Sequence, residues 1–192
     1  MGTFWMVILA VLVLVVVYGV MAYNKLVNLK HSVSKAWANI DILLKQRHDE
    51  IPKLVETCKQ YMKFEQNTLE KVMLARAGVS HAREARDVTA LGRAEGALRS
   101  GLGQLFAVAE AYPELKSNEQ FLHLQGRISN LENTIADRRE FYNESVNINN
   151  VAIEQFPDNM LAGAFNFEPA RLLEFASAEK SDVDMRSLFN AT

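Results

Sequence analysis

The chain has 192 residues, a formal net charge of -2 and a 49% share of hydrophobic residues. This charge balance argues against nucleic acid as the main partner, because phosphate binding needs a concentrated basic face. Cys58 is the single cysteine, so an internal disulfide is excluded. Glycine and proline are few and mark boundaries between segments, which predicts long helices.

The first segment, residues 4–22, contains no charged residue. As a helix it spans roughly 28 Å, close to the thickness of a bilayer's hydrocarbon core. A cleaved signal peptide fits less well, because no Lys or Arg precedes the apolar run and the run is longer than usual. A core helix of a soluble domain would carry a polar stripe, and this segment has none. We therefore expect a retained transmembrane anchor.

Basic residues follow the anchor and set its expected orientation. Lys25, Lys30 and Lys35 precede the first acidic residue, Asp41, and no basic residue precedes Met6. Short flanks rich in Lys and Arg stay on the cytoplasmic side. We expect a single-pass protein with its N-terminus outside and its C-terminal domain in the cytoplasm. Three lysines against none is a modest bias, so the inverse topology remains an alternative.

A largely apolar pattern then recurs at steps of four and three residues from Val33 to Arg76. The seam comprises Val33, Trp37, Ile40, Leu44, Arg47, Ile51, Leu54, Cys58, Tyr61, Glu65, Leu69, Val72 and Arg76. Such a heptad seam predicts a helix of about fifty residues that continues the anchor and packs on partners at shallow angles. Pro52 lacks an N–H group, so we expect the helix to bend or restart there.

Two further long helices are predicted beyond a first turn at residues 78–86. The second helix covers residues 91–109, where Gly92, Gly96, Gly101 and Gly103 either allow another helix to approach closely or simply weaken it. Asn118 is the expected N-cap of the third helix, which runs from about residue 118 to 156 and ends at Pro157. A short fourth element covers residues 159–165.

These elements predict an all-α fold, in which a single N-terminal transmembrane helix continues into an antiparallel up-down-up bundle of long helices with a short fourth helix. Three segments are expected: a transmembrane anchor at 4–22, a helical bundle at 23–176 and a flexible C-terminal tail at 177–192. Apolar contacts around the fourth helix are expected from Phe165, Phe167, Leu172, Leu173 and Phe175.

The run YNKLVNLKHSVSKAWANIDILLKQRHDEIPKLVETCKQY at residues 23–61 resembles the opening of the LemA family of bacterial membrane-anchored helical proteins. The run AVAEAYPELKSNEQFLHLQ at residues 107–125 is similar to that family's YPxLKxNxxFxxLQ pattern. Further matches are Thr68-Leu69-Glu70, Ala75-Arg76, Ile135-Ala136, Arg139, Tyr142-Asn143, Phe156-Pro157 and the FNF at 165–167. The departures are Glu50, Lys53, Phe64 and Asn149, and the one at Phe64 puts in doubt any role for a histidine there.

The resemblance implies one anchor, an antiparallel helical bundle, a bacterial inner-membrane location and no established enzymatic activity. Related proteins are connected with shaping internal membranes in magnetic bacteria. The resemblance thus specifies an architecture more closely than a chemistry.

Neither a catalytic, nor a cofactor-binding, nor a metal-binding set is predicted. The run Arg47-His48-Asp49-Glu50 is the most tempting, but no Glu-x-x-His pair repeats on two helices. The four histidines form no HExxH motif or close i, i+4 pair. Cys58 falls on the apolar seam, where an inert buried thiol is expected. Phosphate-binding and nucleophile-elbow motifs are absent from the sequence.

Four polar residues stand on otherwise apolar seams: Arg47, Glu65, Arg139 and Asn149. Burial of a charge is costly unless the charge is paired, so each is a candidate register or interface residue that needs a partner inside the bundle or between subunits. The alternative for the arginines is that their stems are buried and their charged ends reach water.

Two functional hypotheses follow. The first is a non-catalytic scaffold, in which copies of the chain associate laterally and organise or shape the membrane, with the chain itself and the lipid bilayer as partners. The second is an adaptor that presents the bundle or the C-terminal tail to another membrane protein, such as a quality-control protease. An enzyme ranks third, because no pocket residues can be nominated.

Overall fold

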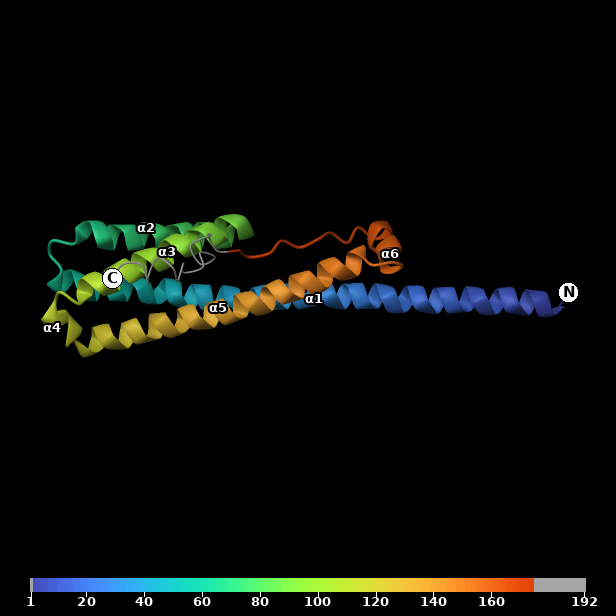
Figure 1. The fold of residues 1–192 in the computed structure, drawn as a ribbon, viewed down its shortest axis with the longest axis horizontal. Helices are drawn as coiled ribbons and strands as arrows, with labels where there is room; N and C mark the ends of the chain where they lie inside the picture. The colour runs from blue at the N-terminus through green and yellow to red at the C-terminus, as the bar shows by residue number, and fades with distance from the viewer. Residues whose placement is uncertain (1, 175–192) are drawn as a thin grey trace, which may run out of the picture. The chain divides into compact units, whose positions relative to one another are not determined.

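The computed structural model describes residues 2–174, and these residues are all-helical, with no strand (Figure 1). The all-α prediction is confirmed. The helices are α1 (Gly2–Tyr61), α2 (Gln66–Glu84), α3 (Val88–Ala109), α4 (Pro113–Lys116), α5 (Glu119–Glu154) and α6 (Asp158–Ala164). They form two compact units, residues 2–44 with 132–172 and residues 45–131 with 173–174, and α1 and α5 each contribute to both. The expected tail, and Phe175, lie outside the described residues.

α1 is one uninterrupted helix of 60 residues that contains Pro52. Of the two outcomes considered at Pro52, a restart of the helix is therefore excluded. The predicted end is wrong, because α1 stops at Tyr61 and α2 begins at Gln66. A hydrogen bond between Arg76 and the backbone of His48 places α2 antiparallel to the end of α1. The steps from Tyr61 to Glu65 and from Glu65 to Leu69 are both four, so the alternation lapses at the break, while each helix of this hairpin buries an apolar stripe of its own.

The turn expected at residues 78–86 is shorter than predicted. Gly78 lies within α2, which continues to Glu84. Arg86 takes a left-handed conformation with φ 52°, which ends the helix. Asp87 then caps α3, because its Oδ1 accepts hydrogen bonds from the backbone N–H groups of Thr89 and Ala90, each at 3.0 Å.

The start of the last long helix is as predicted. The Oδ1 atom of Asn118 accepts a hydrogen bond of 2.9 Å from the backbone N–H of Phe121, which confirms Asn118 as the N-cap of α5. The short helix α4 was not anticipated, and it begins with Pro113, a residue favoured at the first helical position. α5 and α6 match the expected third and fourth elements to within two residues at each helix end.

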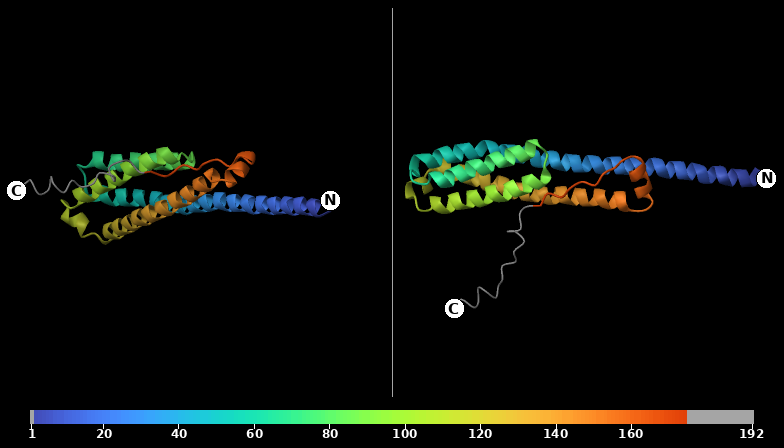
Figure 2. Two further views of the ribbon diagram at one scale, coloured as in Figure 1. Left: turned by 45° about the vertical axis from the view of Figure 1, so that its right-hand side comes forward. Right: turned by 90° about the horizontal axis from the view of Figure 1, so that it is seen from above.

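In the unit of residues 2–44 and 132–172, α6 lies beside α1 in every view (Figures 1 and 2). Leu26, Ala152 and Ala162 are buried together at the contact of α1, α5 and α6. Further along, Trp37 of α1 meets Tyr142 of α5 edge to face, with ring centroids 5.7 Å apart. The first part of α1 has no such cover, because the large apolar residues from Phe4 to Tyr18 are all exposed.

In the unit of residues 45–131, α2 and α3 pack closely along their lengths. A Cβ atom built at Gly101 of α3 would lie 3.5 Å from Val72 of α2, and one built at Gly78 would lie 3.7 Å from Ala94. Of the two interpretations of the glycines, close approach holds at Gly101. At Gly103 nothing lies within 4 Å of a built Cβ, so that glycine serves no packing purpose.

Candidate functional site

One turn of α1, just before Pro52, carries three polar residues that pair with other helices. Successive residues of an α-helix point about 100° apart, so Arg47, His48 and Glu50 face three directions. Each contacts a different helix, α3, α2 and α5 respectively. We call these three residues the polar turn.

Arg47 and Glu95 form an ion pair in the core of this unit. The Nη2 atom of Arg47 donates to Oε1 of Glu95, and each side chain is only 3% exposed. Glu95 follows Leu91 by four residues and precedes Leu98 by three, so it belongs to the buried stripe of α3. A buried charge left alone is very costly, and the pair therefore ties one position of α1 to one position of α3.

His48 and Arg76 join α1 to α2 through two contacts. The Nε atom of Arg76 donates to the backbone carbonyl of His48 at 2.8 Å, and its Nη2 lies 2.6 Å from Nε2 of the His48 ring. Pro52 has no N–H group with which to bond that carbonyl four residues earlier. Arg76 thus supplies the hydrogen bond that the proline removes, which explains how α1 continues through it.

Burial and the same contact both favour the neutral ring of His48. Burial first, and then the Arg76 guanidinium, lower the pKa of the ring below its ordinary value. A guanidinium only donates, so Nε2 accepts and the proton of the neutral ring is on Nδ1. That Nδ1 atom is buried without a hydrogen-bond partner among the described residues.

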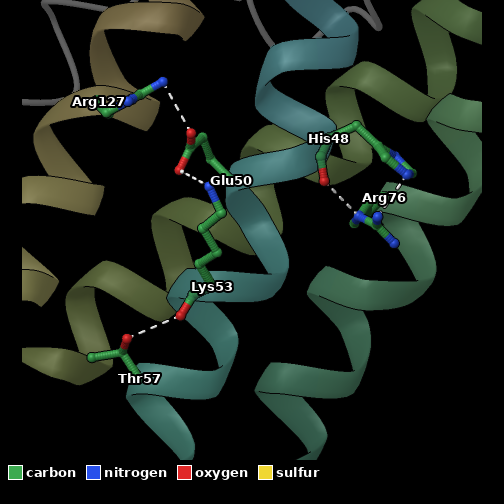
Figure 3. A network of polar contacts seen from close by, with 6 residues as sticks. All are labelled: His48, Glu50, Lys53, Thr57, Arg76 and Arg127. Carbon is green, nitrogen blue, oxygen red and sulfur yellow. Dashed lines mark hydrogen bonds and ion pairs between the residues drawn. The ribbon is translucent and has the colours of Figure 1, made fainter.

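Glu50 completes the polar turn toward α5 (Figure 3). Its Oε1 lies 2.9 Å from Nη2 of Arg127, and its Oε2 accepts from Nζ of Lys53 at 3.3 Å. The carboxylate is nearly buried, whereas both cations are more than half exposed. Thr57 adds a hydrogen bond from its hydroxyl to the carbonyl of Lys53. The turn thus links α1 to its neighbours through charges that are all engaged, which suits a structural role.

The other three predicted residues are placed differently. Glu65 shares the unit of Arg47 and is the residue before α2, where its side chain makes no capping hydrogen bond. Arg139 and Asn149 lie on α5 in the other unit, half-buried and buried respectively. The amide of Asn149 donates to Oδ1 of Asn150 at 3.3 Å, and Asn150 exchanges two hydrogen bonds of 2.9 Å with the backbone of Ala170. Arg47 and Glu65 thus belong to one unit, and Arg139 and Asn149 to the other.

The thiol and the candidate metal ligands can be placed in the described part of the chain. Cys58 is fully buried, and burial raises the pKa of its thiol to about 12, so the thiol stays protonated at neutral pH. Across residues 2–174, no group of three or more His, Cys, Asp and Glu side chains is arranged to hold a metal ion.

A second polar cluster lies where α6 meets α1. Asp158 at the start of α6 is buried, and its Oδ1 accepts from the hydroxyl of Tyr18 at 2.9 Å. Its Oδ2 accepts from Nζ of Lys25 at 2.8 Å. Tyr18 and Lys25 are seven residues apart and so share one face of α1. Hydrogen bonds from Lys25 and Tyr18 hold the pKa of the Asp158 carboxyl below its ordinary value.

Sequence reasoning missed Glu95, Arg76 as a hydrogen-bond donor, and Asp158. Two of them carried a usable signal. Glu95 is a charge at a core position of a helical stripe, and Asp158 is the single charged residue between Glu154 and Glu168. No local pattern pairs a particular arginine with the carbonyl that a distant proline leaves free.

A model of the LemA family matches residues 36–186, most of the chain. The chain belongs to the LemA family. This confirms the resemblance seen in the sequence.

Individual members of the family show how far the similarity extends. Protein LemA of Metamycoplasma hominis is 26% identical over 167 residues, which cover 87% of this chain and 75% of that protein. Magnetosome proteins MamQ 1 and MamQ 2 of Paramagnetospirillum magneticum are each 32% identical over 96 residues, 50% of this chain. The chain spans only 35% of the length of these two MamQ proteins.

Within residues 2–174, one helix, α1, is long and apolar enough to cross a membrane, through its N-terminal part. This agrees with the membrane anchor that is typical of the family.

Proposed function

We propose that this LemA-family protein is a non-catalytic, membrane-anchored scaffold whose copies associate laterally and organise or shape a bacterial inner membrane. The observation that carries the proposal is an exposed apolar stripe on α5. Phe141, Ile148 and Val151 are 55%, 46% and 42% exposed. Their spacings of seven and three residues place them on one helix face, in the pattern by which helices pack side by side.

A second copy of the chain is the occupant that best fits this stripe. Glu144 falls on the same helix face between Phe141 and Ile148, and its charge weakens the apolar contact that this stripe can make with a partner helix. Copies that are each anchored in the same membrane lie in one plane. This raises their effective concentration and favours weak lateral contacts. Exposed apolar residues in a row are otherwise unfavourable on a monomer.

Further support comes from the chemistry of the described residues and from the relatives. The Cys58 thiol is buried and protonated, and the charges of Arg47 and Glu50 are paired, which favours a scaffold over an enzyme. Two relatives are named as magnetosome proteins. That name agrees with the expectation, from the family resemblance, that related proteins shape internal membranes.

The test is the mass and shape of the full-length protein in mild detergent or native membrane discs, by light scattering and electron microscopy. We expect large assemblies for the unchanged chain and dissociation for the double variant Phe141→Glu with Ile148→Glu. Leu74→Glu, at a 72% exposed position of α2, is the matched control and should leave the assembly intact. A strict monomer at all concentrations would contradict the scaffold.

The alternative function gives a different result in the same preparation. An adaptor would be a dispersed anchored chain that retains another membrane protein, such as a quality-control protease. If the C-terminal segment makes that contact, deletion of residues 177–192 removes the co-purified partner.

A further inference from the structure

The contact between α6 and α1 begins inside the predicted anchor. Tyr18, four residues before the end of the apolar run at Ala22, bonds to Asp158 of α6. Ala22 itself is 4% exposed. The part of the anchor ahead of this contact is residues 4–17, fourteen residues, which span roughly 21 Å as a helix. A hydrocarbon core is about 30 Å thick, so these residues alone are too short to cross it.

Residues 18–22 must therefore contribute to the span, which then reaches roughly 28 Å. α6 contacts the first of these residues, Tyr18, in the same compact unit. When α1 spans a bilayer of ordinary thickness, α6 is consequently drawn to the boundary between headgroups and acyl chains.

The surface of α6 and its flanks has the composition that such a position requires. Phe156, Met160 and Phe165 are 80%, 68% and 56% exposed. Between Glu154 and Glu168 the single charged residue is Asp158. Large apolar side chains without neighbouring charges are unfavourable in water and favourable in the interfacial region of a bilayer.

The polar groups at the contact of α6 with α1 are also arranged to suit the boundary between headgroups and acyl chains. Both carboxylate oxygens of Asp158 accept hydrogen bonds, and its side chain is 7% exposed, so no bare charge would enter the lipid. The Lys25 side chain is 54% exposed, and its amine can stay at headgroup level. Tyr23 packs edge to face on Phe165 and Phe167, with ring centroids 4.9 and 5.9 Å away, and aromatic rings are favoured at this level.

We propose that residues 156–165 form an interfacial wedge, which inserts the side chains of Phe156, Met160 and Phe165 into the lipid bilayer beside the anchor. The proposal rests on the membrane anchor of the proposed function but not on assembly of copies. Insertion adds area to one leaflet only, so the wedge gives a single-pass protein a direct way to bend the membrane.

The test uses the full chain in the Cys58→Ala background, reconstituted into phosphatidylcholine and phosphatidylglycerol vesicles. An environment-sensitive fluorophore is attached after Met160→Cys or, as a second wedge site, Phe156→Cys. Phe141→Cys is the matched control, because Phe141 is in the same unit and 55% exposed. Val15→Cys, inside the span, reports separately on the anchor. Quenchers are lipids with a nitroxide near the headgroup end of the acyl chain, and aqueous iodide.

We expect the labels at Met160 and Phe156 to lose fluorescence with the shallow lipid nitroxide and to resist iodide, whereas the label at Phe141 shows no lipid quenching. Iodide quenching at both wedge sites, with lipid quenching at Val15, would overturn the wedge and leave the anchor standing. Wedge labels that resist both quenchers would be covered by protein, and this would also overturn it. Loss of lipid quenching at Val15 would refute the anchor and the wedge together.

Discussion

At the scale of single residues, the Arg47–Glu95 pair is the sharpest test of the register hypothesis. Removal of one partner leaves an uncompensated buried charge, so Arg47→Met should lower the free energy of unfolding by about 3 to 5 kcal/mol. The double variant Arg47→Met with Glu95→Leu should recover most of this loss, because apolar packing replaces both charges. The measurement is chemical unfolding in detergent, followed by far-ultraviolet circular dichroism.

The matched control for this pair lies on the surface of the same helix. Lys59 and Glu56 are 3.7 Å apart and both largely exposed, so Lys59→Met should cost less than about 1 kcal/mol. If Arg47→Met leaves both the unfolding transition and the assembly unchanged, Arg47 has no part in setting the helix register.

A second residue-scale prediction concerns the carbonyl of His48. Arg76→Met should lower the free energy of unfolding by about 1 to 3 kcal/mol, since it leaves that carbonyl without a hydrogen-bond donor. In the Pro52→Ala background, the N–H of Ala at position 52 can bond the carbonyl of His48. Arg76→Met should then lower the free energy of unfolding by less. A double-mutant cycle on unfolding free energies measures the difference. Strictly additive effects would show that Arg76 does not compensate for the proline.

At the scale of helices, α3 carries two glycines with different surroundings. Gly103→Ala should raise the free energy of unfolding by about 1 kcal/mol, because the added methyl group meets nothing and alanine favours the helix. Gly101→Leu should lower it by about 1 to 3 kcal/mol, because the longer side chain would be forced against Val72 of α2. Thermal melting of the two variants, side by side, shows whether each substitution raises or lowers the stability. Equal effects would mean that α2 does not pack on Gly101.

The same scale shows where pattern analysis of the sequence fails. The heptad seam from Val33 to Arg76 is real, since Ile40, Leu54 and Val72 are all fully buried. Yet it belongs to two antiparallel helices. Periodicity reports which residues share a helix face, and the reversal between residues 61 and 66 shows only as two successive steps of four, from Tyr61 to Glu65 and from Glu65 to Leu69. Local residues at 62–65 include neither Gly nor Pro to mark the reversal.

At the scale of the whole molecule, the orientation in the membrane is the open prediction. Lys25, Lys30 and Lys35 are exposed, as expected of basic residues that flank the membrane span on its cytoplasmic side. Protease added outside intact cells or spheroplasts should therefore leave the helical domain undigested, and permeabilised cells should lose it. Replacement of the three lysines by Gln is expected to mix the two orientations. Digestion of the domain in sealed cells would establish the inverse topology.

Local physical chemistry made several features of this protein predictable. Residues 4–22 are apolar over a bilayer's length, Asn118 caps a helix, and the seam positions of Arg47 and Cys58 imply burial, because each of these depends only on composition or on spacing within one helix. The division of α1 from α2, the partners Glu95 and Arg76, and the contact of Asp158 with Tyr18 were decided by the tertiary structure. Such pairs join residues 28 to 140 positions apart, and they depend on which helix faces meet, a choice that no local periodicity encodes.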